Sequence, residues 1–199
     1  MSKKTVLVVG KDKISKNALY KIKKPSSVIV VEDASKSLKR LAKLIYRKKM
    51  SLSLLLRMVY CELKRYNYGP TDNDQVVSSN PSLLKVIKEV NPDKVILFRA
   101  GLIINQELLE TGVPFLNIHC AKVPEFGGLG SISKALKEKA YQQAATFHRV
   151  TEFIDRGEIL DVEPYELDPE LSYCANENKA YEAGAKLLER QLFRNYTFL

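Results

Sequence analysis

The chain has 199 residues, of which 45% are hydrophobic and 28% charged, and its formal net charge is +9. This length fits a single domain with a sizeable core, and nine Gly, eight Pro and no low-complexity tract exclude collagen-like, elastic and disordered material. Residues 1–70 hold 18 Lys and Arg against 4 Asp and Glu, whereas the remaining 129 hold 14 against 19. We therefore expect one domain over 1–199. Its basic part at 1–70 suits a phosphorylated small molecule, nucleic acid or anionic lipid.

The sequence predicts a cytoplasmic protein without a transmembrane segment. The apolar run at 5–10 is too short for a secretory signal, and the one at 50–61 is far below the ~20 residues that span a bilayer. Three scattered cysteines, Cys61, Cys120 and Cys174, fit reduced thiols better than a disulfide framework. No CxxC or HxxxH pair indicates a zinc site.

Short apolar strands and helices alternate from the N-terminus. Residues 5–9 and 27–31 are apolar throughout, as buried parallel strands are, and a Lys-rich segment around 13–22 separates them. A long helical region is predicted from about 34 to 66, and its basic stretch at 36–49 carries leucines at helical spacing. That stretch suits either a helix docked on the sheet or contact with a polyanion or membrane surface. Residues 67–80 are polar and turn-rich, and a loop is predicted there.

The same alternation continues in the second half. Pro81 is predicted to open a helix, and Ser131 to cap another after a Gly-rich loop. The remaining elements are predicted as strands over 94–98, 115–119, 144–150 and 158–164 and as helices over 106–110, 132–140 and 176–193. This order predicts an α/β fold: a Rossmann-like, mostly parallel twisted sheet with helices on both faces.

Two polar side chains share one face at the end of a predicted strand. Asn117 and His119 stand at i and i+2, and open α/β sheets place their ligand crevice at such strand ends. An amide and an imidazole there can act as oxyanion donor and acid–base group. Asp155, before the tight turn that Gly157 permits, is expected to raise the pKa of His119 by stabilising its charged form. His148 is interpreted as a strand residue beneath the site rather than a second base.

Four motifs in this region resemble the signature of the folate-dependent formyltransferases. They are Asn-x-His at 117–119, Pro-x-x-x-Gly at 124–128, Thr-x-His at 146–148 and Asp-x-Gly at 155–157. The resemblance covers about 94–164, the motif-bearing core. The family includes glycinamide ribonucleotide formyltransferase, the catalytic domain of methionyl-tRNA formyltransferase and sugar-nucleotide N-formyltransferases. The resemblance implies the formyltransferase fold.

The resemblance also implies a mechanism. An acceptor amine attacks the formyl carbon of N10-formyltetrahydrofolate, and no metal is required. Asn117 and His119 stabilise the oxyanion, while Asp155 fixes His119 and helps move the proton off the amine. The folate-binding residues that the resemblance implies are Leu102, Ile103, Ile104, Thr151, Glu152 and Ile154. Where most members have Pro-Ser-Leu-Leu-Pro, this chain has Cys-Ala-Lys-Val-Pro at 120–124. Cys120 is interpreted as a small buried residue, because formyl transfer needs no covalent enzyme intermediate.

The length of the chain and the loop after the first predicted strand reduce the number of acceptors to consider. No tRNA-binding domain is expected after the last helix, nor a regulatory domain of the deformylase type before the first strand. Residues 10–13 read Gly-Lys-Asp-Lys, where the loop of the purine enzyme resembles Gly-x-Gly-Ser-Asn. The remaining resemblance is to enzymes acting on nucleotide-linked amino sugars, with Lys11, Lys13 or the basic stretch attracting the acceptor's phosphates.

Two alternatives stay open. One is glycinamide ribonucleotide as the acceptor, and the other is a non-catalytic module that binds a polyanion or a membrane surface. Nucleic acid is not an expected partner, and a homodimer is an expectation from the family alone.

Overall fold

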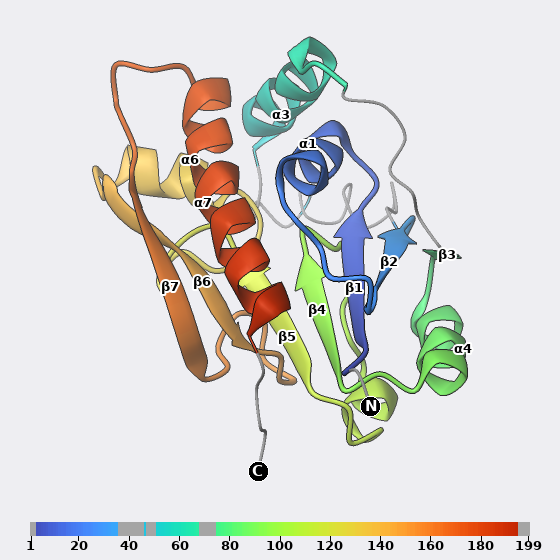
Figure 1. Ribbon diagram of the computed structural model, residues 1–199. Coiled ribbons are helices and arrows are strands. Elements are labelled where there is room, and N and C mark those ends of the chain that lie inside the picture. Colours follow the sequence, from blue (N-terminus) through green and yellow to red (C-terminus); the bar gives the residue numbers. More distant parts are fainter. Residues whose placement is uncertain (1–2, 36–45, 47–50, 68–74, 195–199) are drawn as a thin grey trace.

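A seven-stranded sheet forms the centre of the computed structural model, which describes residues 3–35, 46, 51–67 and 75–194 (Figure 1). Its strand order is β3-β2-β1-β4-β5-β6-β7. The strands are β1 (Thr5–Gly10), β2 (Val28–Asp33), β3 (Gln75–Val77), β4 (Lys94–Phe98), β5 (Phe115–His119), β6 (Gln142–Arg149) and β7 (Ile159–Glu166). β1 to β5 run parallel, whereas β6 is antiparallel to β5 and β7. The predicted α/β fold with a mostly parallel sheet is confirmed.

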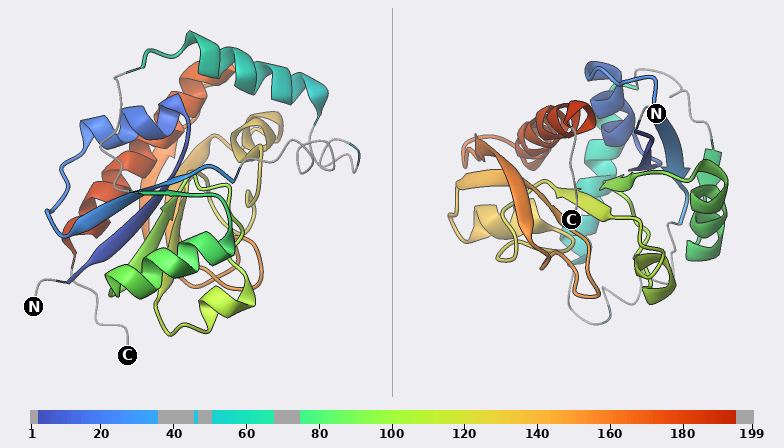
Figure 2. Two further views of the ribbon diagram at one scale, coloured as in Figure 1. Left: turned by 90° about the vertical axis from the view of Figure 1, so that its right-hand side faces the viewer. Right: turned by 60° about the horizontal axis from the view of Figure 1, so that its bottom comes forward.

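Helices cover both faces of this sheet, as predicted. They are α1 (Lys13–Lys21), α3 (Leu52–Lys64), α4 (Asn80–Val90), α5 (Gln106–Leu109), α6 (Ser131–Lys137) and α7 (Tyr173–Phe193). The apolar sides of α1, α6 and α7 join one core cluster, and those of α4 and α5 join a second. α3 lies across the end of the sheet toward which β1 and β4 point, above α1 and α7 (Figure 2).

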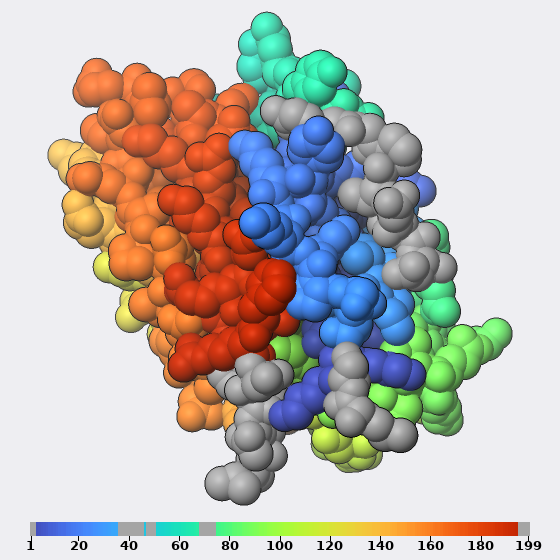
Figure 3. Space-filling view, viewed as in Figure 1, coloured from blue at the N-terminus to red at the C-terminus, as the bar shows by residue number. Residues whose placement is uncertain are grey.

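The longest helix, α7, packs closely on the sheet because the side chains on its inner face are small. A Cβ atom on Gly184 of α7 would lie 2.5 Å from Cys120 Sγ, so only glycine allows this approach. On the surface, α7 and α1 lie side by side, and Lys21 pairs with Glu182 between them at 3.2 Å (Figure 3). α7 is thereby fixed over β5, β6 and β7, beside α1.

The structure corrects two local predictions. The short strand β3 lies in the stretch predicted to be a loop; its three residues pair only with the edge of β2, and so short a strand leaves no alternating pattern. Gly130 at φ 77°, not Ser131, precedes α6, and within the described residues no side chain caps this helix, which ends at Lys137. The predicted helix over 36–49 falls largely outside the described residues, but α3 confirms the remainder of that helical region.

The prediction of reduced thiols is wrong for one pair of cysteines. Cys61 of α3 and Cys174 of α7 form a disulfide across a separation of 113 residues. Their spacing could not reveal it, because the pairing depends on how the two helices meet. Cys120 is a free, buried thiol, as predicted. The cytoplasmic location stays a prediction, and no helix within the described ranges has the length and apolar content to cross a membrane.

Candidate active site

Three predicted site residues meet at the end of β5. Asn117 and His119 lie on β5, where they pair with His148 and Thr146 of β6, and Asp155 lies in the loop that follows β6. The Nδ1 atom of His119 is 3.5 Å from Asp155 Oδ2. The Asn117 amide nitrogen donates to Asp155 Oδ1 at 3.3 Å. The structure thus brings the amide, the imidazole and the carboxylate into one cluster.

Glycines in two loops allow the carboxylate to reach this position. Asp155 has φ 51°, and its Oδ2 accepts a 2.7 Å hydrogen bond from the Gly128 amide. A Cβ atom on Gly127 would lie 3.1 Å from Asp155 Cβ, and one on Gly157 would lie 1.9 Å from the Arg149 carbonyl oxygen. The glycines of the two predicted motifs therefore serve close approaches of backbone to backbone and of loop to side chain.

The proton arrangement on His119 follows from its neighbours. Its Nε2 is 2.9 Å from the Phe126 carbonyl oxygen, which can only accept, so Nε2 carries a proton. In the neutral ring, Nδ1 is then an unprotonated acceptor facing Asp155. Burial lowers the pKa of His119 below 6.5 and outweighs the attraction of the Asp155 charge. Asp155 favours the imidazolium as predicted, but the predicted net rise is wrong because burial dominates.

The carboxylate itself stays ionised. Burial alone would raise the pKa of Asp155, but the adjacent His148 ring, the charge of His119 and the Gly128 amide together lower it to about 2. A negative charge is therefore present beside a neutral imidazole throughout the neutral pH range. Within the described part of the chain, no group of three His, Cys, Asp or Glu side chains is arranged to hold a metal ion.

His148 supports the cluster from below. It is 2% exposed, and its Nδ1 lies 2.8 Å from the Arg149 carbonyl oxygen, so this nitrogen carries a proton. Its Nε2 lies 3.2 Å from Asn117 Nδ2 and 3.5 Å from Asp155 Oδ1. The placement beneath the site agrees with the sequence prediction, and its contacts with both polar side chains are additional.

A cavity of about 840 Å³ runs along the start of β5 and the loop after β6. Of the six predicted folate contacts, Thr151 and Glu152 line it, whereas the structure does not bring the others to it: Leu102, Ile103, Ile104 and Ile154. Ile104 is buried in the core, and Ile103 and Ile154 are exposed. The lining residues that sequence reasoning missed are Lys3, Asp93, Gln106, Leu109, Glu110, Gly112, Val113, Pro114, Phe115, Arg149 and Val150. Two of these, Arg149 and Val150, could have been found from the sequence, because they lie at the end of the strand predicted over 144–150 and next to the predicted contact Thr151.

The two lysines predicted to bind phosphate contact the protein itself. Lys11 Nζ pairs with Glu32 at 3.2 Å. Lys13 Nζ donates to the carbonyl oxygens of Leu63 and Arg65, at 3.1 Å and 2.9 Å, at the end of α3. Their assignment as phosphate ligands stays a prediction.

Carboxylates of the protein also occupy the N-terminus of α1. Asp12 caps the helix by accepting from the Ser15 amide at 3.0 Å, and Glu62 of α3 accepts from the Lys13 amide at 2.7 Å. Helix N-termini that follow the first strand of such sheets are common phosphate sites. Here the two acidic side chains take the place that a phosphate would use.

Comparisons with known proteins agree with this picture. A family model described as Formyl transferase matches residues 3–192. Methionyl-tRNA formyltransferase from Caldicellulosiruptor saccharolyticus is 27% identical over 127 residues, which are 62% of this chain and 40% of that protein. The same enzyme from Hydrogenobaculum sp. is 31% identical over 116 residues, which are 56% of this chain and 38% of that protein. The chain thus spans about 40% of the length of these curated relatives.

Two solved structures share the fold. The phosphoribosylglycinamide formyltransferase from Anaplasma phagocytophilum superimposes with a TM-score of 0.63 and 17% identity, covering 95% of this chain and 85% of that one. A 4-N formyltransferase from Francisella tularensis gives a TM-score of 0.61 and 19% identity, covering 94% and 66%.

Proposed function

Because the chain belongs to the formyl transferase family, we propose that it transfers a formyl group from N10-formyltetrahydrofolate to a primary amine of a small acceptor. The observation that carries the proposal is the convergence of Asn117, His119 and Asp155 through contacts of 3.3 Å and 3.5 Å at the end of β5. The folate supplies the formyl carbon that the amine attacks. All three residues then have a role that suits their chemistry.

His119 is the proton acceptor in this proposal. Its Nε2 proton is committed to the Phe126 carbonyl, so Nδ1 takes up the proton that the attacking amine loses. The resulting imidazolium gains an ion pair with Asp155, whose Oδ2 lies 3.5 Å away. A neutral ring with a lowered pKa is present in its basic form at neutral pH, which is what a general base requires.

Asn117 supplies the donor for the developing oxyanion. Its two amide hydrogens point toward His148 Nε2 at 3.2 Å and Asp155 Oδ1 at 3.3 Å. Both contacts lie at the long end of the hydrogen-bond range, so a negatively charged substrate oxygen can replace the one to Asp155. The contact with His148 keeps the amide plane fixed while this happens.

The cavity fits the size and chemistry of the folate ring system. Its volume of about 840 Å³ lies within the range of ~300–1,000 Å³ typical of small-molecule sites. Leu109, Val113 and Phe115 offer apolar surface, while Thr151 and Glu152 offer polar groups on the loop that leads to the site. We therefore propose this cavity, with the predicted contacts Thr151 and Glu152, as part of the folate site, and the contacts at 102–104 stay a prediction.

For the acceptor we propose a nucleotide-linked amino sugar. Asp12 caps α1 by accepting from the Ser15 amide and also pairs with Arg99, which argues against a ribonucleotide phosphate held at this helix end. One similar fold belongs to a protein described as a 4-N formyltransferase. Homodimer formation and the phosphorylated acceptor remain part of the proposal.

A product assay tests the reaction and the acceptor together. The purified chain is incubated with N10-formyltetrahydrofolate and a panel of nucleotide-linked amino sugars, glycinamide ribonucleotide and methionyl-tRNA, and products are identified by mass spectrometry. We expect a formylated amino sugar that disappears in the His119→Ala variant. Product only from glycinamide ribonucleotide or tRNA would refute the proposed acceptor, and no product from any amine would refute formyl transfer.

A further inference from the structure

The carboxyl ends of β1 and β4 form the edge at which this sheet is expected to bind a ligand. The strand order reverses between these two strands, and open α/β sheets bind ligands outside the strand ends at such a point. Asp12 follows β1 and Arg99 follows β4, and Arg99 Nε donates to Asp12 Oδ2 at 2.8 Å. Their side chains are only 5% and 18% exposed. A charged pair therefore lies at the ligand edge but is closed off from solvent.

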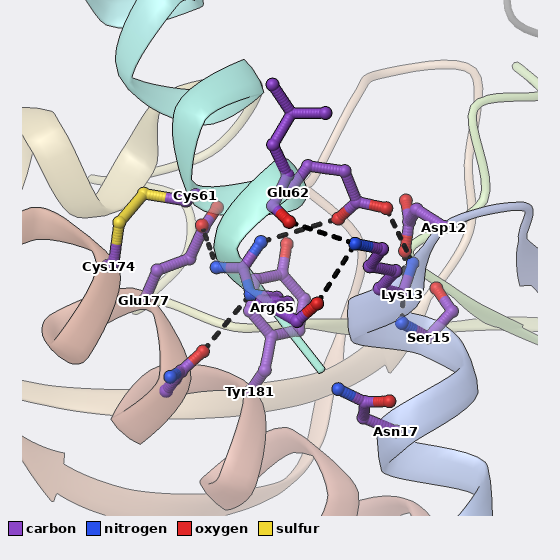
Figure 4. Close-up of polar contacts among 12 residues, drawn as sticks. Asp12, Lys13, Ser15, Asn17, Cys61, Glu62, Arg65, Cys174, Glu177 and Tyr181 are labelled. Atoms are coloured by element: carbon purple, nitrogen blue, oxygen red, sulfur yellow. Dashed lines mark hydrogen bonds and ion pairs between the residues drawn. A yellow bond between two sulfur atoms is a disulfide. The ribbon is translucent and has the colours of Figure 1, made fainter. Parts of the chain in front are cut away.

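The end of α3 contributes to this closure. Arg65, the residue after the helix, forms an ion pair with Glu177 of α7 and donates to Asn178 Oδ1 at 3.2 Å (Figure 4). Its side chain and that of Glu177 are 8% and 3% exposed. Glu62, one turn earlier, binds the Lys13 amide at 2.7 Å. The α3 end thus spans from α7 to α1 across the point where the strand order reverses.

α3 has little of the apolar anchoring that normally fixes a helix to its domain, because Leu54, Leu55 and Met58 are only half-buried. Cys61 is its only buried residue. Its large apolar side chains that are about half exposed or more are Leu52, Leu56, Val59, Tyr60 and Leu63. The helix is therefore held mainly by polar contacts and by the Cys61–Cys174 disulfide.

The other half of α3 reaches the loop of the candidate active site. A Cβ atom on Gly130 would lie 2.8 Å from Leu54 Cδ2, so the helix touches the loop that continues from Gly128, the partner of Asp155. Between these two contact regions, Arg57 lines a cavity of about 430 Å³ that also borders α6 and the turn before α7. This cavity touches α3 only at Arg57, and no residue of α3 belongs to either core cluster, so the helix can lift without opening the main core.

We propose that α3 is a lid over the acceptor side of the active site, locked by the Cys61–Cys174 disulfide and released by a dithiol. The inference rests on the proposed function, since it assigns the covered edge to the acceptor. A dithiol thiolate attacks Cys174, which is half-buried, and its second thiol displaces the mixed disulfide. Two electrons pass to the protein, which gains two thiols, and the dithiol becomes a cyclic disulfide. Release of α3 exposes Asp12 and Glu177 to the acceptor.

Hydrogen exchange at two neighbouring backbone amides distinguishes opening of the lid from unfolding of the rest of the domain. The Lys13 amide donates to Glu62 of α3, whereas the Ser15 amide donates to Asp12 of α1 itself. Hydrogen exchange is followed by NMR in the oxidised protein, in the protein reduced with dithiothreitol, and in a Cys61→Ser/Cys174→Ser variant. We expect Lys13 to exchange at least about tenfold faster in the last two samples, with Ser15 within about twofold. Unchanged Lys13 exchange, or equal acceleration of both amides, overturns the lid.

Transfer kinetics test whether the lid controls the acceptor. We expect reduction to raise kcat/KM for the acceptor at least about tenfold, and the double variant to show the raised value without responding to dithiothreitol. Equal transfer by the oxidised and reduced protein, together with faster Lys13 exchange, overturns control of the acceptor while formyl transfer stands. If neither state transfers formyl to any amine, the proposed function fails, and the exchange measurement alone decides whether the lid exists.

Discussion

Replacing Asp155 by Asn removes the charge in the candidate active site, together with the acceptor that Asp155 Oδ1 offers to the Asn117 amide. The two side chains have nearly the same shape, and an Asn oxygen can still accept from the Gly128 amide, which now donates to Asp155 at 2.7 Å. The substitution therefore keeps the loop in place. It removes the negative charge that lies 3.5 Å from His119 Nδ1.

The distance sets the size of the expected effect. Two unit charges 3.5 Å apart attract each other by about 5 kcal/mol at an effective dielectric constant of ~20. Part of this is recovered by the amide dipole and by solvent when the charge is removed. We therefore expect kcat of Asp155→Asn to fall about 10²–10³-fold, the range of general acid–base effects, because the imidazolium of His119 loses its counter-ion.

Rates and the His119 pKa are measured over the same pH range. In the wild type the pKa lies below 6.5, so transfer should fall as the pH drops through it and stay level above it. In Asp155→Asn the pKa should move lower still, because burial then acts without the opposing charge.

A charge-matched control uses a carboxylate outside the site. Asp161 binds Arg190 at 3.0 Å between β7 and α7, so Asp161→Asn should leave both the rate and the His119 pKa unchanged. Transfer by Asp155→Asn within about threefold of the wild type, or a raised His119 pKa, would refute the proposed role of the charge.

Three further predictions concern the loops and the buried groups around the site. Gly157→Ala would place a methyl group 1.9 Å from the Arg149 carbonyl oxygen. Thermal unfolding should therefore show that the free energy of unfolding falls by about 3 kcal/mol or more. Burial raises the pKa of Cys120 to about 12, so mass spectrometry should find it unmodified by iodoacetamide at about pH 8, and Cys120→Ser should transfer formyl within about twofold of the wild type. The pKa of Asp155, about 2 instead of 3.8, contributes ~2 kcal/mol of stability above about pH 4 that is lost as the pH falls toward 2; urea unfolding curves of the wild type and Asp155→Asn should therefore converge in acid.

The centre of the sheet could be predicted from the sequence because its strands β1 and β4 are buried on both faces. All six residues of β1 are buried, so they form a continuous apolar run that has no polar alternation to confuse it. β3 gave no such signal, since its three residues contact only one strand at the sheet edge. The candidate site could be proposed from the position of Asn117 and His119 at a strand end, which sets where their side chains point, and from the resemblance of the motifs around them.

What the sequence did not predict depends on contacts between distant segments. The disulfide needs α3 to lie on α7, and 113 residues separate the two cysteines. The cavity proposed for the folate is lined mainly by residues from α5, the turn before β5 and the loop after β6, which no local pattern connects. The pKa of His119 was misjudged because the sequence shows its charged neighbour, Asp155, but not how deeply the ring is buried.

Basic residues of the N-terminal part hold the proposed lid closed, and one of them is also a predicted contact of the acceptor. Lys13 donates to the carbonyl oxygens at the end of α3, and Arg65 pairs with Glu177, so two of its cations hold the closed lid. Lys13 lies on α1 and would become available beside the edge where the acceptor is proposed to bind when α3 lifts, whereas Arg65 moves with the lid. The predicted contact of Lys13 with phosphate therefore requires the open state. It follows that an acceptor amine carrying phosphates should gain more from reduction than the same amine without them, because only the former can replace the contacts that Lys13 loses.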